Sequence, residues 1–304
     1  MIRHLGYACK NMTLGSKVLT DRTLREARFN LERVDDIALK NSQDLVRIMR
    51  WNAENGIKFF RIGSGLFPFM DHPKHFYKLE DLASWSLIVK NIVEAGKIAA
   101  EHGIRLSCHP GPYTCIGSPD DLTVVKSVKT IEMHAMLGKL LSCPNDDFVI
   151  NFHVGGVYGN KRETSKRFLN NLEALGDWER NHITIENDDK ESMWSMGDLV
   201  DHGIGNKVRL VFDIHHHRFC NRGETIQQAA KMAFDTWPKN QIPKIHYSES
   251  ADGKRPQAHS DFIENEIPNL LLEREYDVMI EAKAKELALQ KYCKIHNTGP
   301  SSSG

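Results

Sequence analysis

The residues with the clearest capacity for chemistry stand at the end of one short apolar run. Residues 208–212 are followed by Asp213, Ile214 and three consecutive histidines, His215, His216 and His217. The run is too short for a helix and is typical of a buried strand. Strand alternation would place Asp213 and His215 on one face, whereas a turn after Ile214 would let His216 join Asp213. The group is therefore either a metal-ligand pair or a hydrogen-bonded Asp–His pair beside solvated histidines.

Similar residues end the other predicted strands. One histidine in a strand is more often a hydrogen-bonded core residue, and Glu281 could form an ion pair with Lys283. The repetition argues for more, because the C-terminal strand ends of a barrel converge on one mouth. The sequence therefore predicts a multi-metal site with eight ligands from six consecutive strand–helix units: His109, His153, Glu186, Asp213, His216, His246, His259 and Glu281.

The ligand types narrow the chemistry. Imidazole and carboxylate without thiolate suit Mn²⁺, Zn²⁺ or Fe²⁺ and disfavour a structural zinc site. A carboxylate such as Glu186 could bridge two cations at the separation used for in-line displacement at phosphorus. The alternative chemistry is metal-assisted isomerisation or epimerisation of a sugar in a barrel of the same type.

These residues need a scaffold that brings strand ends together, and the chain alternates strand and helix signals throughout. The helical segments include an amphipathic stretch at 80–102 with apolar residues three and four apart. Strands are expected at 4–9, 58–63, 105–109, 147–154, 182–188, 208–213, 243–248 and 276–283. Helices are expected at 32–55, 80–102, after 119, and at 163–180, 192–202, 225–236, 261–274 and 285–292.

Eight such units predict an α/β fold, a single (β/α)₈ TIM barrel with long βα loops at its metal-bearing C-terminal mouth. A doubly wound open sheet is the alternative, but no GxGxxG turn follows the first strand. We expect one barrel domain over residues 1–292 and a flexible tail over residues 293–304.

Composition limits the function classes. The chain has 304 residues, 40% hydrophobic and 26% charged, which suits a folded core rather than disorder or a membrane protein. Lys+Arg and Asp+Glu balance at 40 each, which disfavours a nonspecific nucleic-acid coat but allows a local basic groove. Two basic clusters could supply it: Lys161, Arg162, Lys166 and Arg167 after the fourth strand, and Lys254 and Arg255 after the seventh.

The cysteines favour a reducing compartment. Six cysteines, Cys143 among them, are scattered without a CxxC pair. This pattern is typical of a reduced intracellular protein rather than a disulfide framework. With no signal peptide or long apolar span, we expect an intracellular protein, cytoplasmic or nucleoid-associated if prokaryotic.

An ordered set of short motifs resembles the UV damage endonuclease family, manganese-dependent DNA repair enzymes whose barrel is similar to endonuclease IV. The resemblance runs from about residue 3 to residue 286. Its motifs are LGY at 5–7 with Asn11 and TLG at 13–15, FRIG at 60–63, SCHPGPY at 107–113, HVGG at 153–156 with YG at 158–159, END at 186–188, DIHH at 213–216, KIH at 244–246 and EAK at 281–283.

The resemblance implies an endonuclease that cuts the phosphodiester immediately 5′ to cyclobutane pyrimidine dimers and 6-4 photoproducts, and that could also act at abasic sites. It implies a two- or three-metal manganese cluster, with Zn²⁺, Co²⁺ and Mg²⁺ as alternatives, and damaged double-stranded DNA as partner. No obligatory protein partner is evident, and we expect a monomer. All eight residues above match the family's ligands, which leaves His215 and His217 as extra histidines.

The resemblance also assigns roles beyond the ligands. Glu186, Lys244, His246 and Glu281 are expected to be catalytic, and Lys244 matches a lysine that the family can carry as a carbamate. The alternative for Lys244 is an ordinary ammonium that contacts phosphate. Residues that match the lining of the lesion pocket are Tyr7, Asn11 and His72.

One position departs from the family pattern. The family often has Gln-Tyr after the His-Pro-Gly of the third strand, where the pair probes the duplex at the lesion, and this chain has Pro112-Tyr113. Tyr113 could still stack on bases, and proline can act as an apolar wedge. The hydrogen-bonding amide is absent, so damage discrimination is expected to differ in detail. Tyr113 could instead pack on its own barrel.

Overall fold

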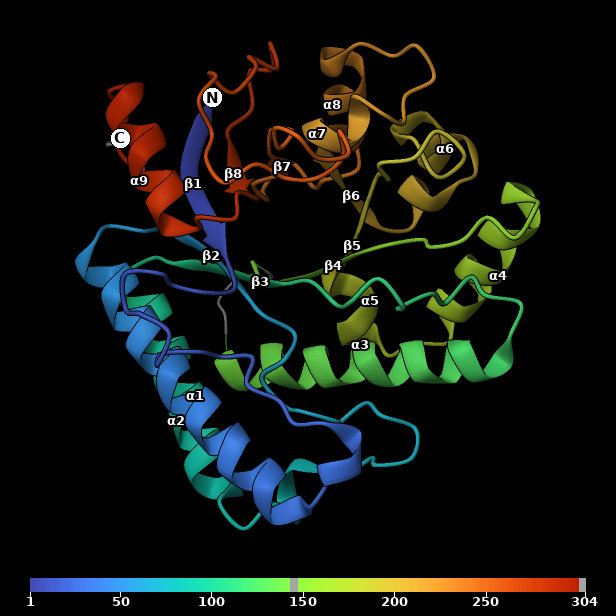
Figure 1. The fold of residues 1–304 in the computed structure, drawn as a ribbon. Helices are drawn as coiled ribbons and strands as arrows, with labels where there is room; N and C mark the ends of the chain where they lie inside the picture. Colours follow the sequence, from blue (N-terminus) through green and yellow to red (C-terminus); the bar gives the residue numbers. More distant parts are fainter. Residues whose placement is uncertain (143–146, 301–304) are drawn as a thin grey trace.

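The eight predicted strands form one closed parallel barrel in which each strand pairs with the next and β8 pairs with β1 (Figure 1). The structure is a computed structural model, and it describes residues 1–142 and 147–300. The strands are β1 Ile2–Ala8, β2 Phe59–Ile62, β3 Arg105–Cys108, β4 Val149–His153, β5 Ile183–Glu186, β6 Arg209–Asp213, β7 Lys244–Tyr247 and β8 Tyr276–Ile280. The predicted (β/α)₈ fold is confirmed.

Helices lie between most consecutive strands, but among the described residues none lies between β7 and β8. In Figure 1 α1 and α2 lie side by side, and α3 crosses the lower part of the view. The α-helices are α1 Leu31–Glu54, α2 Trp85–Glu101, α3 Asp121–Leu141, α4 Lys161–Glu173, α5 Asp177–His182, α6 Met196–Asp201, α7 Ile214–His217, α8 Ile226–Asp235 and α9 Glu286–Ile295. The 3₁₀ turns are η1 Glu26–Arg28, η2 Leu79–Asp81 and η4 Ile204–Asn206.

The helices begin where side chains satisfy their free backbone N–H groups. Asn30 caps α1, Asp120 caps α3 and Asn160 caps α4, each accepting a bond from a backbone amide of the first turn. Thr225 and Gln228 form a reciprocal capping box at α8. These caps set where each helix leaves its βα loop, and so limit how far each loop can extend over the mouth.

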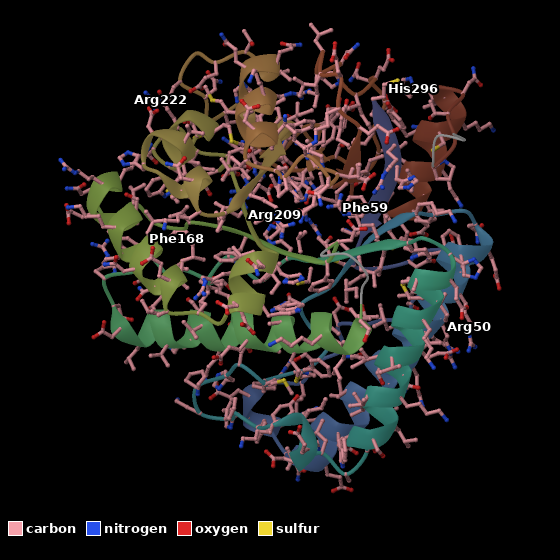
Figure 2. The ribbon with its side chains drawn as sticks, turned by 180° about the vertical axis from the view of Figure 1, so that it is seen from behind. Arg50, Phe59, Phe168, Arg209, Arg222 and His296 are labelled. Atoms are coloured by element: carbon pink, nitrogen blue, oxygen red, sulfur yellow. The ribbon has the colours of Figure 1, made fainter. Side chains whose placement is uncertain are left out.

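The core has two parts. The large apolar cluster fills the space between the strands and the helices. Inside the barrel the apolar groups are few, with Ala8, Phe59 and Met279 in one cluster and Val149 and Val211 in another. Buried polar residues such as Arg209 occupy part of the remaining interior. In Figure 2, Phe59 and Arg209 are labelled near the middle of the molecule, and Arg50 and Arg222 near its edges.

Three expected helices differ from the structure. Residues 261–274 form no helix: Ile263, Ile267 and Leu270 are buried at helical spacing, but Pro268 lacks an amide donor and the segment is irregular. The helix expected at 163–180 is two helices, α4 and α5, separated around Gly176. The helix expected at 192–202 is only the six residues of α6.

The C-terminal segment is more ordered than expected along part of its length. Helix α9 continues to Ile295, three residues beyond the boundary expected at 292. The amide of Leu5 donates to the carbonyl of Pro300 at 2.8 Å, so the segment returns to β1. Residues 301–304 of the expected tail, and Cys143, lie outside the described residues. Among the helices described, none combines the length and apolar character needed to cross a membrane.

Candidate metal centre

Strand register brings the predicted ligands together at the C-terminal mouth. His153 lies opposite Glu186 across β4 and β5, and Asp213 lies opposite His246 across β6 and β7. Ligand atoms of His109, His153 and Glu186 lie within 4.8 Å of one another, and so do those of Glu186, Asp213 and His246. The two groups share Glu186, which therefore sits where two cations could be bridged.

Glu186 is the centre of the contacts. Its Oε2 lies 3.3 Å from Nε2 of His109 and 3.0 Å from Nδ1 of His246, and its Oε1 lies 3.4 Å from Nδ1 of His216. The amide of Asn151 donates to the same Oε2 at 2.5 Å, and the hydroxyl of Thr184 donates to Oδ1 of Asn151 at 2.8 Å. These two buried hydrogen bonds therefore fix the orientation of the Glu186 carboxylate.

Glu281 closes the other side of the centre. Its Oε1 lies 3.0 Å from Nδ1 of His246 and accepts a hydrogen bond from Arg61, which rises from β2. His259 approaches from the loop after β7, with Nδ1 3.8 Å from Oε2 of Glu281. All eight predicted ligands therefore lie in one connected group, although His216, His259 and Glu281 belong to it through these contacts rather than through the two tight triads.

The ambiguity at the end of β6 is resolved by a turn. The chain leaves Asp213 directly into α7, and Oδ1 of Asp213 caps that turn by accepting from the amide of His216 at 2.8 Å. Nε2 of His216 then lies 3.9 Å from Oδ2 of Asp213. His216, rather than His215, joins Asp213 at the centre.

Backbone carbonyls determine which ring nitrogen each histidine presents. Nδ1 of His109 bonds the carbonyl of Pro110 at 2.9 Å, Nδ1 of His216 that of Asn187 at 2.9 Å, and Nδ1 of His259 that of Glu281 at 2.7 Å. A carbonyl only accepts, so each Nδ1 donates in these bonds, and Nε2 is the nitrogen left to bind a metal. This arrangement is typical of metal-binding histidines.

The two extra histidines are oriented the other way. Nε2 of His215 bonds the carbonyl of Gln257 at 3.3 Å, and Nε2 of His217 bonds that of Glu224 at 2.9 Å. The ring of His215 also meets the ring of His259 edge-on at 5.3 Å. His215 therefore braces the loop that carries His259.

The residues present fit divalent cations. Glu186, Asp213 and His246 are at most 1% exposed, whereas His109, His153 and His259 are between 21 and 25% exposed, so the centre is buried at its base and partly exposed at its rim. Oδ2 of Asp213 and Nε2 of His246 are buried without a hydrogen bond to any described residue. Orphaned buried acceptors are costly unless something binds them.

The electrostatics point the same way. Burial alone would raise the pKa of Glu186, but His246, His109 and His153 hold it well below its usual range. Burial alone would lower the pKa of His153, yet Asp188 and Glu186 raise it to about 10. Burial lowers the pKa of His109. Glu186 therefore stays ionised, and its field attracts positive charge that cations can supply in place of protons.

Lys244 lies two residues before His246 on β7 and is fully buried, and its Nζ makes no hydrogen bond within the described part of the chain. Burial and the nearby Arg105 and Arg61 hold its pKa well below the usual range. The amine is therefore neutral and nucleophilic, which suits carbamate formation better than contact with phosphate at the surface. The carbamate itself stays a prediction.

The residues expected to read the lesion are in two settings. Tyr113 is 89% exposed beside the exposed Pro112, so it does not pack on its own barrel. Tyr7 and Asn11 are buried: the Tyr7 hydroxyl donates to Oδ1 of Asn52 at 2.7 Å and accepts from the amide of Asn11 at 2.9 Å. Their roles in lesion binding stay predictions.

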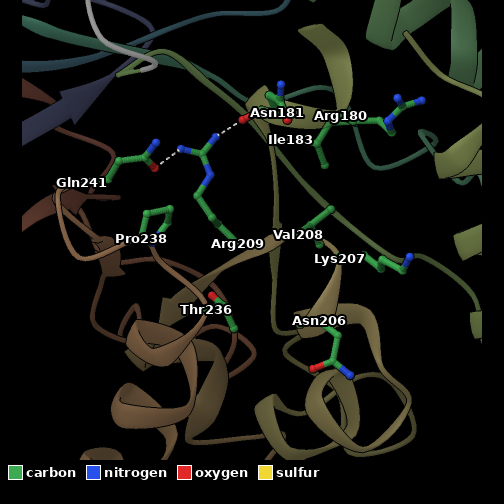
Figure 3. Close-up of a pocket in the computed structure, with 11 residues that line it drawn as sticks. Arg180, Asn181, Ile183, Asn206, Lys207, Val208, Arg209, Thr236, Pro238 and Gln241 are labelled. Atoms are coloured by element: carbon green, nitrogen blue, oxygen red, sulfur yellow. Dashed lines mark hydrogen bonds between the residues drawn. The ribbon is translucent and has the colours of Figure 1, made fainter. Parts of the chain in front are cut away.

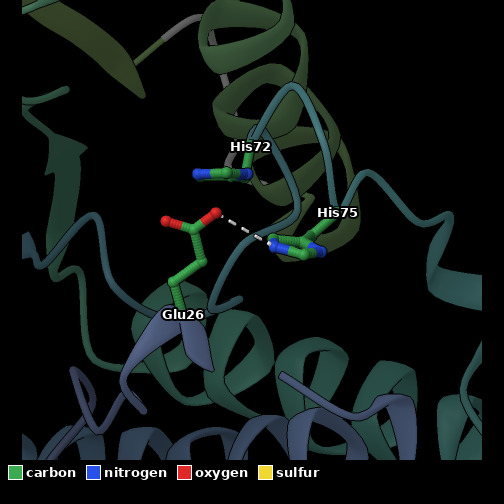
Figure 4. Close-up of side chains that lie close together, drawn as sticks. All are labelled: Glu26, His72 and His75. Carbon is green, nitrogen blue, oxygen red and sulfur yellow. Dashed lines mark hydrogen bonds and ion pairs between the residues drawn. The ribbon is translucent and has the colours of Figure 1, made fainter. Parts of the chain in front are cut away.

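His72 lies in a separate polar group on the second βα loop. Its ring stacks on that of His75 at 4.9 Å, and Nε2 of His75 lies 3.3 Å from Oε1 of Glu26 (Figure 4). His72 was expected from the sequence to be functional, whereas His75 and Glu26 were not. Their only sequence signal is the His-x-x-His spacing, because Glu26 is distant in the chain.

The two basic clusters also differ. In the first, Lys161 pairs with Asp198 at 2.6 Å and Lys166 with Glu163 at 2.9 Å, while Arg162 is exposed. Lys254 and Arg255 of the second cluster are both exposed. Arg162, Lys254 and Arg255 are therefore the members best placed to meet phosphate.

Comparisons with known proteins identify the family. A sequence model of the family described as UV-endonuclease UvdE matches residues 3–299. The UV-damage endonuclease of Schizosaccharomyces pombe is 36% identical over 310 residues, which covers 95% of this chain and 50% of the relative. The UV DNA damage endonuclease of Clostridium perfringens is 30% identical, covering 94% of this chain and 69% of the relative.

Solved structures give the same result. The crystal structure of SacUVDE superposes with a TM-score of 0.84 at 30% identity and covers 98% of this chain and all of that one. Endonuclease IV from Thermus thermophilus reaches 0.60 at 11% identity and covers 97% of this chain and 99% of that one, which shows a shared fold alone. The chain spans only 50% and 40% of the relatives from S. pombe and Neurospora crassa.

Proposed function

Because the chain belongs to the UV-endonuclease UvdE family, we propose that it is a metal-dependent DNA repair endonuclease. In this proposal it hydrolyses the phosphodiester immediately 5′ to cyclobutane pyrimidine dimers and 6-4 photoproducts, and also acts at abasic sites. The observation that carries the proposal is the Glu186 centre, where Nε2 of His109 faces a carboxylate that its histidine neighbours keep ionised and Nε2 of His216 faces Asp213. The substrate is damaged double-stranded DNA, met inside the cell by a monomer.

The proposed cofactor is Mn²⁺, as two or three ions, with Zn²⁺, Co²⁺ or Mg²⁺ as alternatives. The eight ligands would hold the ions, and Glu186 would bridge two of them. Bound ions of this kind supply a lowered pKa for water and charge that complements the phosphate. The donor set suits these ions because it combines imidazole and carboxylate, and no cysteine belongs to either triad.

The residues around the ions have separate tasks. Asn151 and Thr184 keep the carboxylate of Glu186 oriented, and Arg61 does the same for Glu281. His246, buried against both carboxylates, fixes their spacing. Lys244, as a carbamate, would add a negative ligand from below. Each group is held in advance, so little reorganisation is needed when DNA binds.

The rim would recognise the damage. Exposed Tyr113 and Pro112 can enter the stack where a photoproduct has weakened it, which costs less than opening intact DNA. Arg162, Lys254 and Arg255 would contact phosphates on either side. Tyr7, Asn11 and His72 would line the pocket for the damaged dinucleotide after the loops adjust.

A nicking assay on one duplex with and without a defined cyclobutane dimer tests the proposal. We expect a single cut 5′ to the dimer in Mn²⁺, weaker cutting in Co²⁺ or Mg²⁺, and no cut in chelator. Folded protein that leaves the lesion strand whole in all three metals contradicts it. Conversion between ketose and aldose sugars without DNA binding would support the isomerase alternative, which has no use for an exposed Tyr113.

A further inference from the structure

We propose a second divalent-cation site, separate from the barrel centre, formed by Glu26, His72 and His75. Its ion class is a borderline cation such as Zn²⁺, since the donors are two imidazoles and one carboxylate. It would fasten η1 of the first βα loop to the 69–75 turn of the second. The proposal does not depend on the endonuclease activity.

The spacing of the donors supports the site. One ligand atom from each of the three side chains lies within 4.8 Å of the other two. Zinc bound at about 2.1 Å from tetrahedral ligands places those ligands about 3.4 Å apart. Nε2 of His75 and Oε1 of Glu26 are already 3.3 Å apart, so a small movement of the half-exposed Glu26 brings the group to that geometry (Figure 4).

Aromatic neighbours hold both imidazoles in place. The rings of Phe29 and His72 stack on that of His75, with ring centres 4.2 and 4.9 Å away. Phe69 meets both imidazoles edge-on, at 5.4 Å from His72 and 5.8 Å from His75. Two imidazoles already immobilised lose little freedom when they bind an ion, as in other supported ligand shells.

The backbone of this turn is also unusual. Phe69 has φ of 63°, in the left-handed region that a non-glycine residue with a bulky side chain rarely enters. The amides of His72 and His75 bond the carbonyls of Phe69 and His72 at 3.0 and 3.2 Å, so the strained turn sets the two imidazoles on one side. Strain of this kind is found where the surrounding structure serves a site.

Two present contacts would be replaced by the ion. The ammonium of Lys74 lies 4.0 Å from Glu26, and its side chain is 76% exposed, so solvent makes that ion pair weak. The amide of Lys74 donates to Nδ1 of His72 at 3.3 Å, a long hydrogen bond. Ligation through either nitrogen of His72 gives up this bond, and one weak bond is a small loss beside a metal–nitrogen bond.

Measuring the zinc content per chain of the 304-residue protein tests the site. Protein stripped with chelator is loaded with ZnCl₂, desalted and analysed for zinc per chain, beside a Glu26→Gln/His75→Gln double variant. His102→Gln serves as the matched control, because His102 is an exposed histidine on a different surface. The barrel centre contributes equally to all three proteins, so we expect one zinc fewer in the double variant alone. Equal zinc content in all three overturns the proposal.

Chemical protection locates the ion. Diethyl pyrocarbonate modifies unliganded imidazole, so zinc should protect His75 at least tenfold in the wild type and leave it reactive in a Glu26→Gln single variant. Mass spectrometry of the peptide that contains His75 gives the readout. Reactivity of wild-type His75 that does not change at saturating zinc overturns the proposal, whether or not the protein cuts DNA.

Discussion

Charged side chains are buried at both ends of the barrel, but the hydrogen bonding of those side chains differs between the two ends. At the base, Asp277 accepts two bonds from Arg3, at 2.9 and 2.6 Å, and one from Arg105 at 2.8 Å. At the mouth, Oδ2 of Asp213 and Nε2 of His246 have no hydrogen bond to the residues that the structure describes. A buried carboxylate whose hydrogen bonds are satisfied stabilises the fold, whereas a buried carboxylate oxygen without a partner is available to bind an ion.

Aromatic packing strengthens the base further. The guanidinium of Arg105 lies 5.6 Å from the ring centres of Phe59 and Trp237, and that of Arg209 lies 5.0 Å from Trp237. Arg209 also donates to Oε1 of Gln241 at 2.7 Å and to the carbonyl of Asn181, beside a cavity of about 390 Å³ (Figure 3). The comparison teaches that arginines pair the buried charge at the base, whereas the mouth gathers carboxylates and imidazoles and leaves some of their polar atoms without a partner among the described residues.

The largest effect is expected from Glu186→Gln at the mouth. The variant keeps the shape of the side chain but removes the charge that two triads share, so cutting should fall by on the order of 10³-fold. The melting temperature should stay within about 3 °C of the wild type. Nicking kinetics and thermal unfolding measure the two. If the variant cuts normally, or is unfolded, the mouth is not a functional centre of the kind described.

The matching change at the base is Asp277→Asn. It leaves Arg3 and Arg105 buried without their counter-charge, and breaking a buried pair in this way costs about 3–5 kcal/mol in the free energy of unfolding. Urea unfolding measures the loss. Nicking per folded molecule should be unchanged, and a variant that stays stable but inactive would reverse the roles assigned to the two ends.

Lowering the pH should reduce the stability that Asp277 contributes at the lower end of the barrel. Burial would raise the pKa of Asp277, but Arg3 and Arg105 hold it below its usual value. The stability from this carboxyl is therefore complete above the unfolded-state pKa of about 3.9 and is lost as pH falls through the lower folded-state pKa. Urea unfolding of the wild type and Asp277→Asn is measured between about pH 7 and pH 2. The difference in their free energies of unfolding should become smaller below about pH 4. A constant gap contradicts the expectation.

The smallest effect sharpens the mouth itself. His215→Phe keeps a ring against His259 but removes the bond to the carbonyl of Gln257, whereas His215→Gln can still donate there. We expect Mn²⁺ affinity to fall about tenfold in the Phe variant and to recover in the Gln variant, since supporting residues commonly contribute this much. Calorimetric Mn²⁺ titration measures it. Equal affinities in the two variants would show that His215 only fills space.

The fold could be predicted from the sequence because strand and helix signals alternate eight times and long helices carry clear caps. The error at 261–274 arose because buried residues at helical spacing also occur in an irregular segment interrupted by Pro268. The choice between His215 and His216 depended on a turn after Ile214, which a local pattern cannot decide. Arg61, Asn151 and Glu26 were missed because their partners are distant in the chain and meet them only across the barrel or between loops.

The pairing of β1 with β8 has a consequence for how the protein is made. These strands lie near opposite ends of the chain, yet Ile2 lies opposite Tyr276 and Tyr7 opposite Ile280. Asp277 and Glu281, which complete the base and the mouth, emerge from the ribosome after the other seven strands of the barrel. Contacts of such long sequence separation form slowly, and an unclosed sheet leaves strand edges open to other chains. The nascent barrel therefore depends on delayed closure, and its site cannot exist before that step.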